Sequence, residues 1–341
     1  MPDKADAPKA TVFEFEPSEY ADFYRENGYA HIPGGASAEF MRFALHFAES
    51  KIKTRGREEL SDWQFKDKKL QFLMEFPDNC DYPNGLYRSV ASVADLDVEN
   101  MMIGERHIKI YEGNAPENPP PHKDRLASEI TVGIGLKIPK NSRIVLYPEH
   151  ELTVNPYQSA AQWRTSLDPE DLPEQVLAGV DPVEIDMRPG DVVMFAGNSI
   201  YHERTHPANA WVLYMKFNAM RLDPIAEDPK TLPQRQRSLA LLAESSDVEL
   251  LGMRVEVSPR LEKVSRHYTR QHWMEVLQGS ILGEKKFTLS ETEWAALRTL
   301  DDRNIEMSDL IARMGFPKQR AVTYVPFLRR LAKVGAIDVR D

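Results

Sequence analysis

Two histidines and one aspartate are the residues of this chain whose types and spacing point most clearly to chemistry. His122 and Asp124 are separated by one residue and follow a run of prolines, and His202 comes shortly after a Pro-Gly-Asp turn at 189–191. Two imidazoles and one carboxylate form the facial set that holds Fe(II) and leaves coordination positions open. A His-x-Asp pair alone is a common chance match, but extended segments on both sides and a second histidine strengthen it. The sequence therefore predicts a metal site with His122, Asp124 and His202 as ligands.

Two other histidines are weaker candidates. His206 lies four residues after His202 and could replace it, but it follows the end of the predicted strand and precedes Pro207. His107 falls in an alternating segment, where a histidine with a structural role is the simpler interpretation.

The segments around the three ligands have the pattern of short strands. Apolar or alternating runs separated by turns extend from Arg106 to Asn218, without the strand-helix alternation of a parallel sheet. Such a pattern favours an antiparallel barrel or a double-stranded β-helix. Helical spacing before it predicts two helices, one ending at Gly28 and one over 38–51. We therefore expect an α+β protein whose double-stranded β-helix domain, with its N-terminal helices, covers residues 1–222.

The remainder of the chain has helical character. Residues 223–287 are expected to form a helical connector, with helices over 232–245 and 265–277. Residues 288–341 are expected to form a separate small domain. They begin with a capping box and continue in the helix and strand order of a winged helix. Pro326 departs from that order, because it should break or kink the long last helix expected over 317–334.

The segment 148–182 is a long, proline-containing excursion with little periodicity. Connections of this length are usually functional, and a lid that sets substrate specificity is the interpretation that we favour.

Composition limits the classes of function. The chain has 341 residues, of which 42% are hydrophobic and 28% charged, which suits a folded protein with a substantial core. Its net charge of -10 argues against binding to a nucleic-acid duplex, because phosphate contacts need a positive surface. The single cysteine, Cys80, suits a reducing compartment. No secretory signal and no membrane-spanning stretch is visible, so a cytoplasmic location is expected.

Two phrases in the sequence resemble a known family. The phrase ADFYRENGYAHI at 21–32, and RPGDVVMF at 188–195 leading into His202, resemble phytanoyl-CoA-hydroxylase-like members of the Fe(II)/2-oxoglutarate-dependent oxygenase superfamily. The C-terminal segment instead resembles JmjC-type ribosomal oxygenases, which carry a winged helix behind the β-helix. The resemblance covers about residues 18–222 and, with less specific motifs, 288–341. It implies that His122, Asp124 and His202 bind Fe(II), with 2-oxoglutarate as cosubstrate.

The chain departs from the family where the cosubstrate should be anchored. Phytanoyl-CoA-hydroxylase-like members place an arginine about ten residues beyond the distal histidine, whereas this stretch, 210–212, is Ala-Trp-Val. Two lysines could substitute. Lys216 has the same strand parity as Tyr214 and Asn218, and Lys137 occupies a position where JmjC-like members place a cation. Lys216 and Lys137 are thus the predicted cofactor-binding residues, with Arg143 and Arg204 as lesser candidates.

The resemblance implies a dioxygenase that oxidises a C–H bond, by hydroxylation or otherwise, and releases succinate and carbon dioxide. A small organic metabolite is the preferred substrate, with dioxygen as the other reactant. One alternative is a peptidyl or ribosomal-protein hydroxylase of the JmjC type. Another is a metal-binding cupin that is not an oxygenase, either an isomerase or a regulator. A homodimer or a protein partner bound through the C-terminal region is also expected, whereas a nucleic-acid or membrane partner is not.

Overall fold

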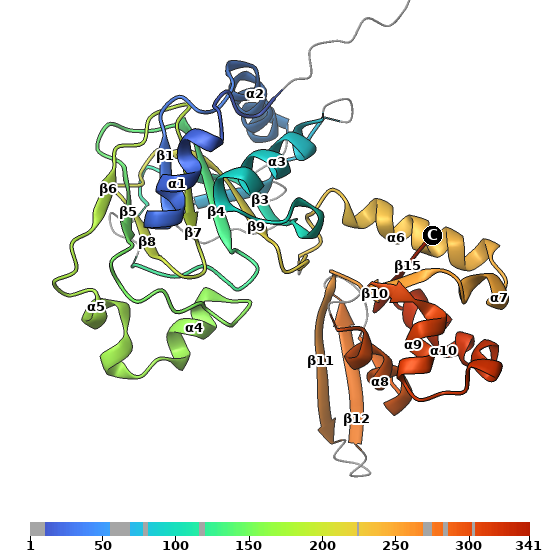
Figure 1. Cartoon of the computed structure of the whole chain (residues 1–341). Coiled ribbons are helices and arrows are strands. Elements are labelled where there is room, and N and C mark those ends of the chain that lie inside the picture. The colour runs from blue at the N-terminus through green and yellow to red at the C-terminus, as the bar shows by residue number, and fades with distance from the viewer. Residues whose placement is uncertain are drawn as a thin grey trace, which may run out of the picture. The chain divides into compact units, whose positions relative to one another are not determined.

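The computed structural model describes residues 11–54, 69–77, 81–115, 120–223, 225–268, 275–281, 286–301 and 304–341. The chain divides into two compact units, Met1–Arg221 and Leu222–Asp341 (Figure 1). Each unit has a hydrophobic core of its own.

The first unit is built on two antiparallel sheets (Figure 1). The larger sheet has the strand order β1-β7-β4-β9-β3-β2, and the smaller sheet has the order β6-β5-β8. The strands of both sheets, in chain order, are β1 (Tyr29–Ile32), β2 (Lys69–Leu73), β3 (Met102–Tyr111), β4 (Ile130–Lys137), β5 (Arg143–Tyr147), β6 (Val183–Ile185), β7 (Val192–Ala196), β8 (Tyr201–Thr205) and β9 (Trp211–Asn218). From β3 onward, β3, β4, β7 and β9 lie in the larger sheet, and β5, β6 and β8 lie in the smaller one, so the chain crosses repeatedly between the two sheets. With β3 and β9 paired, the arrangement is the predicted double-stranded β-helix.

The outer face of the larger sheet carries the main core. Its apolar side chains, such as Ile108 on β3 and Leu213 on β9, pack in one cluster with Phe40 and Tyr87. Both aromatic residues come from helices that precede the β-helix. The helices before the β-helix are α1 (Ser18–Asn27), α2 (Ala38–Thr54), α3 (Tyr82–Ala94) and the short 3-10 helix η1 (Val98–Asn100). Gly28 ends α1 in a left-handed conformation with φ of 73°, as the sequence predicted.

The inner face differs along its length. At one end, Ile144 and Leu146 of the smaller sheet pack with Val193 and Phe195 of the larger sheet in a separate apolar cluster. At the other end, β3 has apolar side chains on the face towards the helices and charged or polar side chains on the inner face. The inner face carries Glu105, His107, Lys109 and Tyr111. The interior of the β-helix is therefore filled by apolar side chains at one end and lined by polar side chains at the other.

The segment 148–182 has some secondary structure of its own: α4 (Ala160–Ser166), the 3-10 helix η2 (Pro169–Asp171) and α5 (Pro173–Val176). It connects β5 to β6.

The second unit combines helices with two three-stranded sheets, ordered β14-β10-β15 and β11-β12-β13. Its elements are α6 (Thr231–Glu244), α7 (Asp247–Leu250), β10 (Arg254–Val257), β11 (Leu261–Tyr268), β12 (Glu275–Ile281), β13 (Phe287–Leu289), α8 (Glu291–Leu300), β14 (Ile305–Glu306), α9 (Met307–Arg313), the 3-10 helix η3 (Lys318–Tyr324), α10 (Val325–Lys333) and β15 (Ile337–Arg340). The capping box expected at Ser290 is present, with Glu293 as its partner.

One expectation for this unit is wrong, and the break expected at Pro326 is present. The helix expected over 265–277 is absent, because the described residues of that stretch pair as strands β11 and β12. Long-range strand pairing has overridden the local helical spacing. The helix expected over 317–334 is divided at Pro326, which lies in the first turn of α10, where a missing N–H costs no hydrogen bond.

The segment 288–341 has the helix order expected of a winged helix, but the middle strand of its sheet is β10, which precedes it in the chain. The winged helix therefore stays a prediction. Two cations of this segment, Arg329 and Arg330, form ion pairs within the unit. Arg329 pairs with Asp247 at 2.7 Å, and Arg330 pairs with Glu293.

Among the described residues, no helix has the length and apolarity that crossing a membrane requires.

Candidate metal centre

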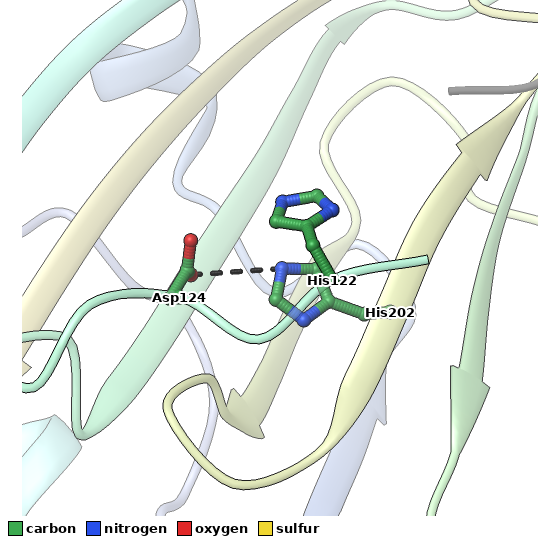
Figure 2. Close-up of side chains that lie close together, drawn as sticks. All are labelled: His122, Asp124 and His202. Carbon is green, nitrogen blue, oxygen red and sulfur yellow. Dashed lines mark ion pairs between the residues drawn. The ribbon is translucent and has the colours of Figure 1, made fainter. Parts of the chain in front are cut away.

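The three predicted ligands converge at one place in the β-helix. One donor atom from each of His122, Asp124 and His202 can be chosen so that all three lie within 4.8 Å of one another. His202 Nε2 lies 3.6 Å from Asp124 Oδ2, and the two imidazole rings have centroids 4.5 Å apart. Figure 2 shows His122 and Asp124 extending from one loop towards the ring of His202 on β8. Asp124 and His202 are buried, and His122 is exposed.

Backbone hydrogen bonds hold the two histidines together. The His122 N–H donates to the His202 carbonyl at 3.1 Å, and the His202 N–H donates to the His122 carbonyl at 3.0 Å. This antiparallel bridge adds one residue of the ligand loop to the edge of the smaller sheet, next to β8. The spacing of the histidines is thus fixed by sheet pairing.

The hydrogen bonds of the imidazoles leave one nitrogen of each free for a metal. His202 Nδ1 lies 3.0 Å from the Ile200 carbonyl, and His122 Nδ1 lies 3.3 Å from the Pro120 carbonyl. A carbonyl can only accept, so each Nδ1 carries the proton and each Nε2 presents a lone pair. Metal-ligating histidines commonly show this arrangement, which fixes both tautomer and ring orientation.

The carboxylate of Asp124 is fixed by two side chains. Thr131 on β4 donates to Oδ2 at 2.7 Å, and Lys216 on β9 donates to Oδ1 at 2.5 Å. Gly197 lies against this carboxylate so closely that a Cβ there would collide with the Thr131 hydroxyl and lie 3.0 Å from Asp124 Oδ2. Only glycine therefore fits at this position, because any side chain would collide with Thr131.

The start of the segment 148–182 supports the ligand loop. Asn155 donates from Nδ2 to the Asp124 carbonyl at 2.8 Å, and the Leu126 N–H donates to the Tyr157 carbonyl at 2.7 Å. Between the two ligands, the buried ammonium of Lys123 donates to the Thr153 carbonyl at 2.6 Å and lies over the ring of Tyr201. Residues 153–157 therefore form a brace for the loop, and the lid expected over 148–182 stays a prediction.

Electrostatics favour the protonation states that metal binding needs. Burial alone would raise the pKa of Asp124, but the ammonium of Lys216 holds it below its usual value. Burial lowers the pKa of His202, and the surrounding protein together with the neighbouring His202 lowers the pKa of His122. Near neutral pH the site thus holds a carboxylate and two neutral imidazoles, which is the form of each that binds a metal.

The two predicted lysines lie in different places. Lys216 is buried, and it faces the interior together with Tyr214 and Asn218, as its parity predicted. Lys137 lies on the outer face, paired with Glu49 on α2 at 2.9 Å and stacked on Trp211. A β-bulge between Gly135 and Lys137 reverses the alternation at that point, which places Lys137 away from the triad.

The sequence did not single out two charged residues of the interior as important. Glu105 on β3 is buried, and its Oε2 lies 3.6 Å from Lys216 Nζ. Arg204, named only as a lesser candidate, lies two residues after His202 on β8 and is 4% exposed. Strand parity could have indicated both, because Arg204 shares the face of His202, and Glu105 shares a face of β3 with His107 and Lys109. The rival ligand His206 lies beyond the end of β8, and Arg143 pairs with Asp186 at 3.1 Å.

The residues present fit a divalent transition-metal ion. The donor set has two nitrogens and one carboxylate oxygen, arranged from one side, and each donor is oriented by a hydrogen bond of its own. Two imidazoles and a carboxylate with open positions are typical of Fe(II).

When the chain was compared with known proteins, similarity was found to solved structures but not to family models or curated sequences. No family model matches the chain, and no curated protein matches it. The structure is similar to the α-ketoglutarate-dependent carbocyclase SnoK from nogalamycin biosynthesis, with 16% identity, a TM-score of 0.45, and coverage of 58% of this chain and 82% of SnoK. It is also similar to the epimerase SnoN from the same biosynthesis, with 13% identity, a TM-score of 0.42, and coverage of 59% and 82%.

A third similar structure is a prolyl-4-hydroxylase from Pseudomonas putida. It has 11% identity and a TM-score of 0.40, and the match covers 59% of this chain and 98% of the hydroxylase.

Proposed function

We propose that the chain is an Fe(II)- and 2-oxoglutarate-dependent dioxygenase. The observation that carries the proposal is the convergence of His122, Asp124 and His202 inside a double-stranded β-helix, with both Nε2 atoms free and the carboxylate ionised. Iron bound there would supply the redox chemistry that couples decarboxylation of 2-oxoglutarate to oxidation of a substrate C–H bond. The remaining work belongs to the chain itself, which must bind, orient and shield the reactants.

Arg204 is the residue that we assign to the distal carboxylate of 2-oxoglutarate. Its guanidinium donates to neutral acceptors only: the Tyr214 hydroxyl at 3.1 Å, the Ser142 hydroxyl at 3.3 Å and the Met187 sulfur at 3.4 Å. Within the described parts of the chain, no carboxylate pairs with it. A buried guanidinium without a counter-ion is costly, and a planar carboxylate is the anion that suits its geometry best.

The distance along β8 supports this assignment. Arg204 and His202 are two residues apart on one strand, so their side chains leave the same face about 7 Å apart. A five-carbon dicarboxylate that binds the metal through its 2-oxo acid end has a comparable length. Tyr111 on β3 lies beside Tyr214, and the pKa of Tyr111 is raised, first by burial and then by that neighbour, so its hydroxyl remains a proton donor.

For the substrate we propose a small organic molecule. His122 is the exposed ligand of the three, which gives the metal an accessible side. Next to the triad, the inner face of β3 is polar rather than packed with apolar side chains. These features support a substrate with polar groups, whose reacting carbon lies beside the open side of the metal.

Anaerobic titration tests the proposed function. Addition of Fe(II) and then 2-oxoglutarate to the purified protein should produce a weak visible charge-transfer band, and admission of dioxygen should then yield succinate. Metal binding without the band and without succinate would overturn the proposal and favour a cupin that is not an oxygenase.

Replacement of Arg204 by methionine tests the carboxylate assignment. Methionine keeps much of the side-chain volume but removes the charge, so binding of 2-oxoglutarate to the Fe(II) protein should weaken about 10- to 100-fold, consistent with the loss of a charged hydrogen-bonded contact of about 1.5–3 kcal/mol. Titration of the visible band measures the affinity. Lys137→Met, on the outer face, is the matched control and should bind as the unaltered protein does. Equal affinity in the Arg204 variant would exclude it as the anchor.

A further inference from the structure

We propose that Lys216 restricts Asp124 to one metal-binding oxygen and thereby keeps a coordination position free for the cosubstrate. This inference rests on the proposed function, and it gives Lys216 a positioning role in place of direct contact with 2-oxoglutarate.

The two oxygens of Asp124 have different surroundings. Oδ2 accepts a hydrogen bond from the neutral Thr131 hydroxyl at 2.7 Å and faces His202, whose Nε2 lies 3.6 Å away, so it is on the metal side. Oδ1 accepts a hydrogen bond from Lys216 Nζ at 2.5 Å. An ammonium carries a positive charge as well as its protons, so it repels a second cation from the oxygen that it contacts, which a neutral hydroxyl does not. Asp124 therefore offers Oδ2 to a metal and withholds Oδ1.

A second carboxylate, that of Glu105, helps to hold Lys216 in this position. Glu105 on β3 lies directly opposite Lys216 in the register of β3 and β9, and its Oε2 is 3.6 Å from Lys216 Nζ. Glu105 is fixed in turn by Lys109 at 3.3 Å and by Arg125 at 3.6 Å. The side chain of Lys216 is 9% exposed, which leaves little freedom to swing away from Asp124.

A carboxylate without such a partner can bind a metal through both oxygens. In this site that change would occupy one more position and leave fewer for 2-oxoglutarate, which needs two. Removal of the Lys216 charge also removes a cation close to the metal, and cations repel. We therefore expect loss of Lys216 to leave metal affinity equal or higher while cosubstrate binding weakens, a combination that general damage to the site would not produce.

The test uses Co(II), whose visible spectrum reports coordination, with Lys216→Met, Lys216→Arg and the control Lys137→Met. Lys137 pairs with Glu49 on the outer face, away from the triad, so its replacement removes the same charge without altering the site. The Co(II) spectrum of Lys216→Met without cosubstrate should differ from that of the unaltered protein, at an equal or higher Co(II) affinity. Lys216→Arg should restore the spectrum, and Lys137→Met should leave it unchanged.

Binding of oxalate separates the positioning role from that of an anchor. Oxalate occupies two metal positions but has no distal carboxylate, so Lys216→Met should bind it about tenfold or more weakly if Lys216 controls Asp124. If Lys216 instead held the distal carboxylate, oxalate binding and the Co(II) spectrum would be unchanged, and the inference would be overturned. Loss of Co(II) binding in Lys216→Met would also overturn it. If the unaltered protein binds Co(II) and oxalate but not 2-oxoglutarate, the proposed function fails while the role of Lys216 remains measurable.

Discussion

Replacement of Asp124 by alanine should abolish succinate formation and reduce the affinity for Fe(II) by more than about 100-fold, beyond the 10- to 100-fold typical of changes next to a metal ligand. Asp124 is the one anionic donor of the triad, and its loss also leaves the ammonium of Lys216 buried without its 2.5 Å partner, close to the metal position. That unpaired cation would repel the ion. Metal titration and a succinate assay measure the two effects.

The control for this variant is Asp22→Ala. Asp22 lies on α1, and its side chain is 85% exposed in a pair with Arg25, so its removal should change neither metal affinity nor turnover. Retained succinate formation in Asp124→Ala would refute the ligand assignment and, with it, the proposed function.

Substitution of Gly197 by alanine should damage the site without altering any ligand. The added Cβ would collide with the Thr131 hydroxyl and lie 3.0 Å from both Asp124 Oδ2 and the Ser128 carbonyl. Thr131 must then move and lose its 2.7 Å hydrogen bond to Asp124. We expect metal affinity to fall about 10- to 100-fold, and the free energy of unfolding to fall by about 1–3 kcal/mol, as in other overpacked interiors. Metal titration and chemical denaturation test both.

A matched glycine is available for comparison. Gly85 lies within α3, and a Cβ there would meet no atom within 4 Å. Gly85→Ala should therefore stabilise the protein by about 0.5–1 kcal/mol, because alanine loses less conformational freedom in a helix. If Gly197→Ala bound metal as tightly as Gly85→Ala does, close packing around the carboxylate would not be what orients Asp124.

The sequence was sufficient to predict that His122, Asp124 and His202 converge, because their positions depend on local features. His122 and Asp124 share a face of an extended loop, and His202 follows the turn that enters the strand pair of the β-helix. Parity likewise placed Lys216 inside. Parity predicts the face of the sheet on which a side chain lies, but it does not predict which residues of other strands lie beside it. The contact between Lys216 and Asp124 therefore could not be predicted from parity.

The remaining differences arise from tertiary structure. The family resemblance suggested Lys137 as a cofactor-binding residue, but the bulge after Gly135 turns it to the outer face, and a single inserted residue of this kind leaves little trace in sequence. Each hydrogen bond between residues 153–157 and the ligand loop has a backbone carbonyl as its acceptor, and such partners cannot be read from a side-chain pattern. The strands β11 and β12 depend on pairing with each other, which outweighs local helical spacing.

The reciprocal backbone bonds between His122 and His202 link occupancy of the site to conformational stability. The two imidazoles come together only when the ligand loop is hydrogen-bonded to β8. An unfolded chain therefore has no comparable metal site, and a bound metal ion would stabilise the native state. By mass action a bound ion at 100 times its dissociation constant would add about 2.7 kcal/mol to that preference. Melting temperature should consequently rise with the concentration of free metal, so the supply of metal would set the stability of the fold as well as the activity that we propose for it.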